Sequence, residues 1–186
     1  MVKTSKRTRA ELIENRLVIW DPAKGTELYK QGYYGKPLGI PKPKILEFQV
    51  PLLLDLLEGY YLLEKGKIAI YENGKKLSKT ELYPRVNELY TDFELKYHVY
   101  RDLRGKNLIV SPGIKFGCDF AVYEHGPGID HAPFLIQVKR SDEKIDAVEI
   151  VRAGRLATTV RKRFIIAIPN KTLEKVDYIS FRWWKA

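Results

Sequence analysis

The alternation of apolar and polar positions in the first half of the chain predicts two hairpins. Residues 10–21 have the period of two short strands around a tight turn near Glu14-Asn15. Residues 66–77 repeat this pattern, and the Asn73-Gly74 pair within them is a strong local signal for a hairpin turn. We therefore expect strands on both sides of each turn.

Helical spacing is visible between and after these hairpins. The tyrosine-rich stretch 26–34 predicts a short helix, and leucines on one stripe predict another over 49–58. Ser78 is expected to cap a helix, because a glutamate follows it three residues later as in a capping box. A longer helix is expected over about 86–104, ending near Gly105.

A proline-rich segment, residues 35–44, separates the first of these elements from the next. Its three prolines and two glycines exclude a helix and a central strand. It also carries three lysines and no acidic residue. The sequence therefore predicts an extended basic loop.

The second half of the chain alternates strands with a helix, which is typical of a small mixed α/β domain. The expected strands are 107–110, 116–123, 133–139, 163–168 and 175–184, with a helix over about 143–161. We predict an α+β chain with a small N-terminal α/β domain over 1–100. A C-terminal α/β domain with a central mixed sheet follows over 101–186.

The charge of the chain favours a polyanionic partner. Lysine and arginine number 33 against 23 acidic residues, a formal net charge of +10, and such a surface attracts nucleic acid. One cysteine, Cys118, excludes an intrachain disulfide and argues against a thiolate metal site. No apolar signal segment follows the basic start, and the longest apolar run is interrupted by Asp55, so we expect a cytoplasmic protein.

Three polar residues stand at the ends of predicted elements, where functional groups are usually displayed. Tyr123 ends a strand, His131 lies in the Gly/Pro loop that follows, and Lys162 lies where a helix gives way to a strand. Each also has an ordinary explanation, as a packing tyrosine, a solvated loop histidine and one lysine of a charged face. His125 competes with His131 for any histidine role.

A phenol, an imidazole and an ammonium together can cleave RNA without a metal. A base takes the proton from the ribose 2′-hydroxyl, an acid protonates the departing 5′-oxygen, and a cation stabilises the phosphorane. A positioned acid or base contributes about 10²–10⁴-fold, and one preorganised charge contact about 10²–10³-fold. Spacing alone does not raise the three residues above their ordinary explanations.

The segments around these residues resemble the tRNA-splicing endonuclease family. Residues 100–105 resemble the family's segment at the end of its linking helix, 113–123 its central strand signature, and 155–162 the helix that ends in its lysine. The resemblance covers the whole chain and is strongest over about 96–168. It implies a restriction-endonuclease-like fold for the C-terminal domain. It also implies metal-independent, cofactor-free cleavage of precursor tRNA at intron–exon junctions in a bulge–helix–bulge motif.

The resemblance gives each of the three residues a role. Tyr123 matches the family's general base, His131 rather than His125 its general acid, and Lys162 its transition-state stabiliser. The implied products carry 2′,3′-cyclic phosphate and 5′-hydroxyl ends. Because free tyrosine has a pKa near 10, a cation such as Arg161 is needed to favour the phenolate. Whether Tyr123 takes the proton or only orients the hydroxyl stays open.

RNA binding is predicted at four further basic residues. The resemblance implies two arginines that hold a flipped base between their guanidinium planes. Arg155 matches the first, and Arg182 is our interpretation of the second. Lys42 and Lys44 are predicted to contact RNA, because prolines stiffen their loop and lower the entropy cost of binding. The alternative for each is a solvated surface cation.

The resemblance also implies an oligomer, since relatives of this size are tetramers. The aromatic stretch 178–184 would form an aggregation-prone edge if it were exposed, so we expect it to pair with another subunit. Glu124 and Asp130 lie on the loop that in the family docks into a neighbour's basic cleft. Loop 35–44 resembles an insertion found in archaeal lineages whose enzyme pairs two different subunits. Together these features favour an α2β2 heterotetramer with a homologous non-catalytic subunit; a homotetramer is the alternative.

Two other functions stay open from the sequence. Asp119, with Gln137 and Lys139 on the next strand, resembles the acid and lysine pattern of metal-dependent restriction-enzyme-like nucleases, such as Holliday-junction resolvases. However, Gln137 stands where metal capture normally uses a second carboxylate. The second alternative is a non-catalytic RNA-binding subunit. The joint presence of Tyr123, His131 and Lys162 argues against it.

Overall fold

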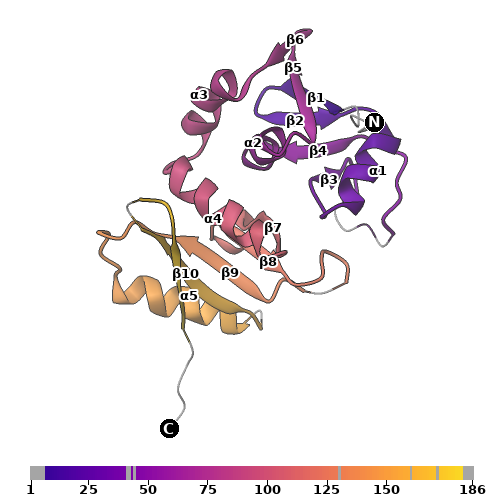
Figure 1. Cartoon of the computed structure of the whole chain (residues 1–186). Helices are drawn as coiled ribbons and strands as arrows, with labels where there is room; N and C mark the ends of the chain where they lie inside the picture. Colours follow the sequence, from indigo (N-terminus) through magenta and orange to yellow (C-terminus); the bar gives the residue numbers. More distant parts are fainter. Residues whose placement is uncertain are drawn as a thin grey trace. The chain divides into compact units, whose positions relative to one another are not determined.

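The chain forms two compact units, Met1–Phe93 and Glu94–Ala186, each with its own sheet. The structure, a computed structural model, describes residues 7–40, 43, 45–129, 131–159, 161–170 and 172–181, apart from the side chains of residues 152, 156 and 157 (Figure 1). Within this part of the chain, no helix has the length and apolar composition needed to cross a membrane. The predicted α+β class and two-domain organisation are confirmed.

The N-terminal unit is built on a six-stranded sheet in the order β3-β4-β2-β1-β5-β6. Its strands are β1 (Thr8–Ile13), β2 (Arg16–Ile19), β3 (Lys36–Pro37), β4 (Leu52–Asp55), β5 (Ile68–Glu72) and β6 (Lys75–Leu77). Its helices are α1 (Pro22–Lys30), α2 (Leu56–Glu64) and α3 (Lys79–Leu89).

Both predicted hairpins are confirmed. β1 pairs antiparallel with β2, and β5 pairs antiparallel with β6. The turn residues Glu14 and Asn73 have φ angles of 52° and 48°, the left-handed conformation that tight hairpin turns require. The capping box is also present: the Ser78 hydroxyl accepts from the Glu81 amide, and the Glu81 carboxylate accepts from the Ser78 amide.

The predicted helix over 49–58 is wrong in its first part. Residues Leu52–Asp55 form β4, between β2 and β3, and α2 begins only at Leu56. The Asp55 carboxylate accepts from the Leu57 amide at 3.0 Å, which caps the helix at this point. Leu52 and Leu54 are fully buried on one face of the strand. A short apolar run fits both the period of a helix and that of a strand, so pairing with neighbouring strands decided the conformation.

Other element boundaries also differ from the predicted ones. The helix expected over 26–34 begins earlier, at Pro22, because Asp21 caps it by accepting from the next two amides. The long helix expected over 86–104 is two helices, α3 and α4 (Phe93–Gly105), although its predicted end near Gly105 is right. Within loop 35–44, the two residues of β3 pair with β4 at the edge of the sheet.

The C-terminal unit holds a five-stranded mixed sheet in the order β11-β10-β9-β8-β7. β9 and β10 are parallel, and the other neighbouring pairs are antiparallel. The strands are β7 (Ile109–Pro112), β8 (Phe120–Tyr123), β9 (Phe134–Val138), β10 (Arg163–Pro169) and β11 (Val176–Ser180). The 3₁₀ helix η1 (Ile114–Phe116) precedes β8, and α5 (Ala147–Thr159) connects β9 to β10.

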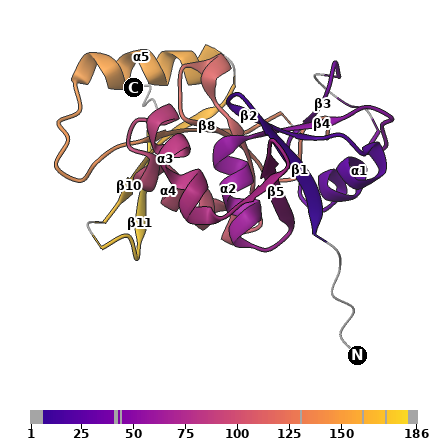
Figure 2. The same cartoon turned by 90° about the horizontal axis from the view of Figure 1, so that it is seen from above.

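Helices cover both faces of this sheet (Figure 2). On one face, buried residues of β8, β9 and β10 pack with Ala153 of α5. On the other face, Tyr100 of α4 packs against Phe120, with ring centroids 6.0 Å apart. Arg104 of α4 donates to the Val110 carbonyl of β7 at 3.1 Å. Burial on both faces makes this sheet a rigid support for side chains at its edges.

The strand predicted over 116–123 begins later than expected. Phe116 belongs to η1, and Gly117 has a φ of 66°, so the chain turns before β8 starts at Phe120. Of the strand predicted over 175–184, residues 176–180 form β11, and residues 182–184 lie outside the described part of the chain.

A network around Tyr178 predicts a loss of stability at alkaline pH. Tyr178 of β11 donates to the Asp102 carboxylate at 2.5 Å, and Lys106 forms an ion pair with the same carboxylate. Burial and the hydrogen bond to Asp102 raise the pKa of Tyr178 above its ordinary value. In the N-terminal unit, burial and Asp55 raise the pKa of Tyr90 in the same direction.

The unfolded chain, with tyrosine pKa values near 10, releases these protons at lower pH than the folded chain does. We therefore expect the free energy of unfolding to fall as pH rises above about 10, by up to about 1.4 kcal/mol per pH unit for each tyrosine. Urea unfolding between about pH 8 and pH 11 measures this. The free energy of unfolding of the Tyr178→Phe variant should depend less on pH. If its pH dependence equals that of the unchanged chain, Tyr178 does not cause the alkaline loss of stability.

Candidate functional site

Tyr123 lies at the end of β8, at the border of the C-terminal core. It is the last residue of the strand and is paired in register with Ile109 of β7. Its side chain is partly buried and packs against a cluster that includes Ala121 and Leu135, on the same face of the sheet as α5. The phenol is thus held by packing on a central strand of the sheet.

His131 lies on the segment that leads into β9. β8 and β9 are antiparallel, with Val122 opposite Phe134. The end of β8 and the start of β9 therefore lie side by side along one edge of the sheet, the edge at which these strands begin or end. His131 precedes Phe134 by three residues and is exposed, whereas Ala132 beside it is 2% exposed and belongs to the core cluster. The backbone at His131 is therefore anchored while its imidazole remains accessible.

Lys162 reaches the same edge from a third strand. It directly precedes β10, which runs parallel to β9 with Arg163 opposite Phe134, and the Arg163 amide donates to the Pro133 carbonyl at 2.8 Å. The Lys162 ammonium donates to the Ala132 carbonyl at 2.5 Å. It therefore contacts the backbone of the residue next to His131.

An aromatic ring also contacts Lys162. The ammonium lies 5.2 Å from the centroid of the Phe116 ring, a cation–π distance, and the lysine is partly buried. By strand alternation Lys162 shares a face with Phe164, as Tyr123 does with Ala121. Phe164 and Ala121 belong to the same cluster. The tyrosine and the lysine thus lie on the same face at one edge.

The turn before Lys162 explains how a helix and a strand meet there. α5 ends at Thr159, and Arg161 takes a left-handed conformation with a φ of 54°, as residues just past helix ends often do. Its amide donates to the Thr158 carbonyl at 3.1 Å. This reverses the chain, so that Lys162 enters the sheet beside β9.

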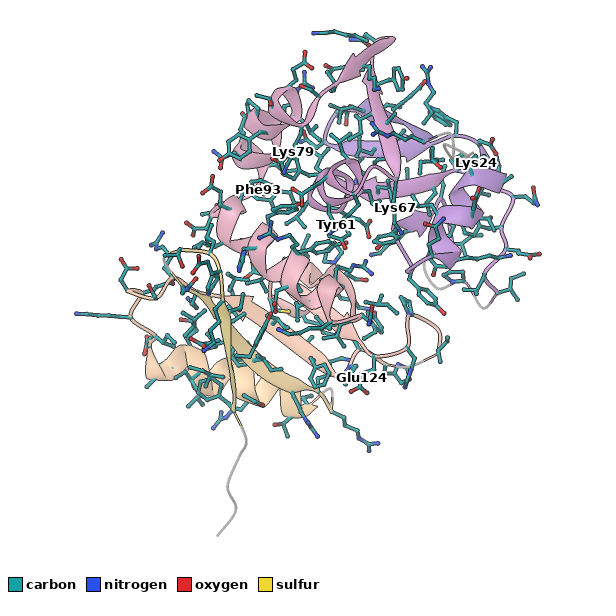
Figure 3. All side chains as sticks on the ribbon, viewed as in Figure 1. Lys24, Tyr61, Lys67, Lys79, Phe93 and Glu124 are labelled. Carbon is teal, nitrogen blue, oxygen red and sulfur yellow. The ribbon has the colours of Figure 1, made fainter. Side chains whose placement is uncertain are left out.

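The other predicted site residues are placed only in part. Arg155 is exposed on α5, upstream of the helix end that leads to Lys162. Glu124, the residue after Tyr123, is labelled in Figure 3 at the same end of the sheet. Four residues lie outside the described part of the chain, namely Lys42, Lys44, Asp130 and Arg182.

The acid and lysine pattern that resembles a metal-dependent nuclease forms a set of internal contacts. One carboxylate oxygen of Asp119 pairs with Lys96 of α4 at 2.8 Å. The other accepts from the Gln137 amide and from the Val138 backbone, both at 2.8 Å. Both oxygens that could face a metal are therefore already bonded to donors within the unit.

Lys139 is likewise committed to neighbours. Its ammonium pairs with Glu143 at 2.8 Å and with Glu149 at 2.9 Å, and only 12% of its side chain is exposed. The hydrogen bond that Lys139 donates to the Glu143 carboxylate raises the pKa of Lys139, so the ammonium stays charged. Among the residues with described placement, no cluster of three or more acids, histidines or cysteines could hold a metal ion.

Cys118 behaves as a packing residue and not as a reactive thiol. It packs against the core cluster and donates to the Phe120 carbonyl at 3.4 Å. Burial raises the pKa of the thiol to about 11, so it stays protonated near neutral pH.

Sequence reasoning missed the two groups that hold Lys162. Phe116 was assigned to a strand, and a backbone carbonyl such as that of Ala132 gives no signal in a residue pattern. Lys96 as the partner of Asp119 was missed as well, because the two belong to elements separated by a strand and a turn. The Gly-rich segment before β8 was the available hint of a turn at Phe116.

Comparison with known proteins matches both units of the chain. The family described as "tRNA intron endonuclease, catalytic C-terminal domain" matches residues 93–178, and "tRNA intron endonuclease, N-terminal domain" matches residues 8–83. A tRNA-splicing endonuclease of Hyperthermus butylicus is 49% identical over 178 residues, covering 95% of this chain and 98% of the relative. Those of Sulfurisphaera tokodaii and Sulfolobus acidocaldarius are 43% and 40% identical and cover 94% and 95% of this chain and 98% of each relative.

Proposed function

The chain belongs to the tRNA intron endonuclease family and is a tRNA-splicing endonuclease, and from this premise we propose that Tyr123, His131 and Lys162 form its active site. The observation that supports this most is the hydrogen bond from Lys162 to the Ala132 carbonyl, at the sheet edge where β8 ends in Tyr123. It links the lysine to the segment that carries His131. Three elements distant in sequence thus contribute to one edge.

In the proposed reaction the ribose 2′-oxygen attacks the adjacent phosphorus, and the bond from phosphorus to the 5′-oxygen breaks. Tyr123 accepts the 2′-hydroxyl proton or orients that hydroxyl, and His131 gives a proton to the leaving 5′-oxygen. Lys162 stabilises the negative charge of the phosphorane. The products carry a 2′,3′-cyclic phosphate and a 5′-hydroxyl.

Packing supports these roles for Tyr123 and Lys162. An ammonium has three N–H donors, so the bond to Ala132 fixes Lys162 without using up its charge. Phe116 contacts the same ammonium at 5.2 Å. Tyr123 is partly buried against the core cluster, which limits the movement of its ring. Such preorganisation removes the cost of arranging charges when the phosphorane forms.

We further propose that the reaction needs no metal, because the Asp119 carboxylate is bonded to Lys96, Gln137 and Val138. Cleavage of a bulge–helix–bulge RNA should proceed at an unchanged rate in excess EDTA. End-group analysis should find cyclic phosphate and 5′-hydroxyl ends. Loss of cleavage on chelation, restored by Mg²⁺, would favour the metal-dependent nuclease instead.

RNA binding by Arg155 and Arg182, and by Lys42 and Lys44, is part of the proposal. Arg155 is exposed on α5, and guanidinium planes are suited to an unpaired base of the bulge.

We propose that the enzyme acts in the cytoplasm as an α2β2 heterotetramer with a homologous non-catalytic subunit, with a homotetramer as the alternative. Two active sites held at a fixed separation would then cut both bulges. Cleavage by the purified chain alone, compared with cleavage after adding the second subunit, tests this assembly.

A further inference from the structure

One face of the six-stranded sheet in the N-terminal unit is covered by α1 and α2. Gly59 of α2 lies so close to β2 that an added Cβ would stand 1.9 Å from Leu17 Cδ1. A Cβ added at Gly25 of α1 would stand 3.0 Å from Leu52 Cβ of β4. Leu17 and Leu52 are fully buried. Because side chains alternate along a strand, the intervening residues point to the opposite face, which we call the open face.

The open face carries a continuous row of side chains across all six strands. Strand register aligns neighbours from one edge of the sheet to the other in the order Lys36, Leu53, Val18, Glu11, Tyr71 and Lys76. The row therefore begins and ends with a lysine, and an aromatic ring and a carboxylate lie near its centre.

Four residues of the open face form a connected group, which we call the platform: Arg9, Glu11, Trp20 and Tyr71. The Arg9 guanidinium lies 4.3 Å from the centroid of the Tyr71 ring. Glu11 accepts from Arg9 at 3.0 Å with one oxygen and from the Trp20 indole at 2.9 Å with the other. These contacts hold two flat groups in place, although Trp20 is 53% exposed and the Arg9 side chain 58% exposed.

We propose that the platform binds an unpaired stretch of RNA by stacking its bases on Trp20 and Arg9. The inference rests on the proposed function, in that the RNA is taken to be part of the precursor tRNA substrate. Proteins recognise unpaired bases by stacking them on aromatic rings and guanidinium planes, beside cations that contact the phosphates. The platform combines both planes.

The charges around the platform favour RNA as its occupant. Arg16, Lys36 and Lys76 are exposed on the strands of the same face, where they can contact phosphates. The Glu11 carboxylate is engaged by Arg9 and Trp20, and Asp55 accepts from the Leu57 amide. A protein partner would also use tryptophan and arginine. However, lysine is depleted in protein interfaces, and Lys36 and Lys76 lie at the two ends of the row on this face.

The test measures binding of the full chain to a fluorescent single-stranded RNA of about 12 nucleotides that contains no cleavage motif. Trp20→Ala should weaken binding about 10-fold, because the base that stacks on the indole ring loses its stacking partner. Arg9→Lys keeps the charge but removes the plane, and it should weaken binding several-fold. Because this RNA is not cut, the result does not depend on the roles of Tyr123, His131 and Lys162.

Arg85→Lys is the matched control. Arg85 lies on α3, bonds the Glu72 carboxylate through Nη2 at 2.8 Å and has 46% of its side chain exposed, so it undergoes the same chemical change away from the platform. The affinity of this variant for the RNA should stay within about twofold of that of the unchanged chain. Unchanged affinity in both Trp20→Ala and Arg9→Lys would overturn the proposal. A change of oligomeric state in these variants, measured by sedimentation, would also overturn it and identify the face as a protein interface.

Discussion

Replacing His131 with alanine is expected to slow cleavage of a bulge–helix–bulge RNA by about 100-fold or more, because the leaving 5′-oxygen loses its proposed proton donor. Lys162→Ala should cause a loss of similar size, because it removes the cation that we propose stabilises the phosphorane. Binding of the RNA should change little in either variant, since each substitution removes only one polar side chain from a chain with a net charge of +10. Single-turnover cleavage and binding assays on the same RNA separate the two effects.

Two substitutions elsewhere in the C-terminal unit serve as controls. His125→Ala removes an exposed imidazole from the loop that also carries His131. Lys175→Ala removes a lysine that precedes β11 and has 74% of its side chain exposed. Both should cleave within about twofold of the unchanged chain. Cleavage by His131→Ala and Lys162→Ala at the rate of these controls would refute the active site proposed here.

Lys162→Arg gives a finer measure of the same site. The guanidinium keeps the positive charge, but it is planar and longer than an ammonium, so it does not reproduce the contacts with the Ala132 carbonyl and the Phe116 ring. We expect the cleavage rate of this variant to lie between the rates of Lys162→Ala and of the unchanged chain. Its folding should be normal, because the lysine is only partly buried.

The sequence predicted those elements whose local signals agree with their tertiary surroundings. The turns at Glu14 and Asn73 and the capping box at Ser78 depend on a few neighbouring residues, and all three were predicted correctly. The strand β4 was missed, because a run of leucines has no period that separates a strand from a helix. Pairing with β2 and β3, which no local pattern reveals, decided its conformation.

The candidate site was predictable only as three separate element ends. Tyr123, His131 and Lys162 could be assigned to the ends of a strand, a loop and a helix, but their common edge follows from the order β10-β9-β8 in the sheet. That order depends on contacts between residues far apart in the sequence. The bond from Lys162 to a backbone carbonyl is beyond any residue pattern, so the resemblance to a family, and not spacing, brought the three together.

The turn that leads into β8 gives the second large expected effect. Gly113 donates from its amide to the Asp119 carbonyl at 2.8 Å and accepts from the Phe116 amide at 2.8 Å. A Cβ added there would stand 2.6 Å from the Cys118 sulfur, 2.7 Å from the Cys118 carbonyl oxygen and 2.8 Å from the Phe120 amide nitrogen. Two of these three atoms belong to the backbone and cannot rotate away.

Gly113→Ala should therefore lower the free energy of unfolding by about 3 kcal/mol, since overpacking forces the backbone to move. Urea unfolding followed by circular dichroism measures this loss. Gly105→Ala is the matched control: nothing lies within 4 Å of its added Cβ, and at the end of α4 alanine should stabilise by roughly 0.5 to 1 kcal/mol. Because η1 carries Phe116, Gly113→Ala should also slow cleavage in conditions where the chain remains folded. Equal stability of the two variants would mean that the turn before β8 adapts without cost.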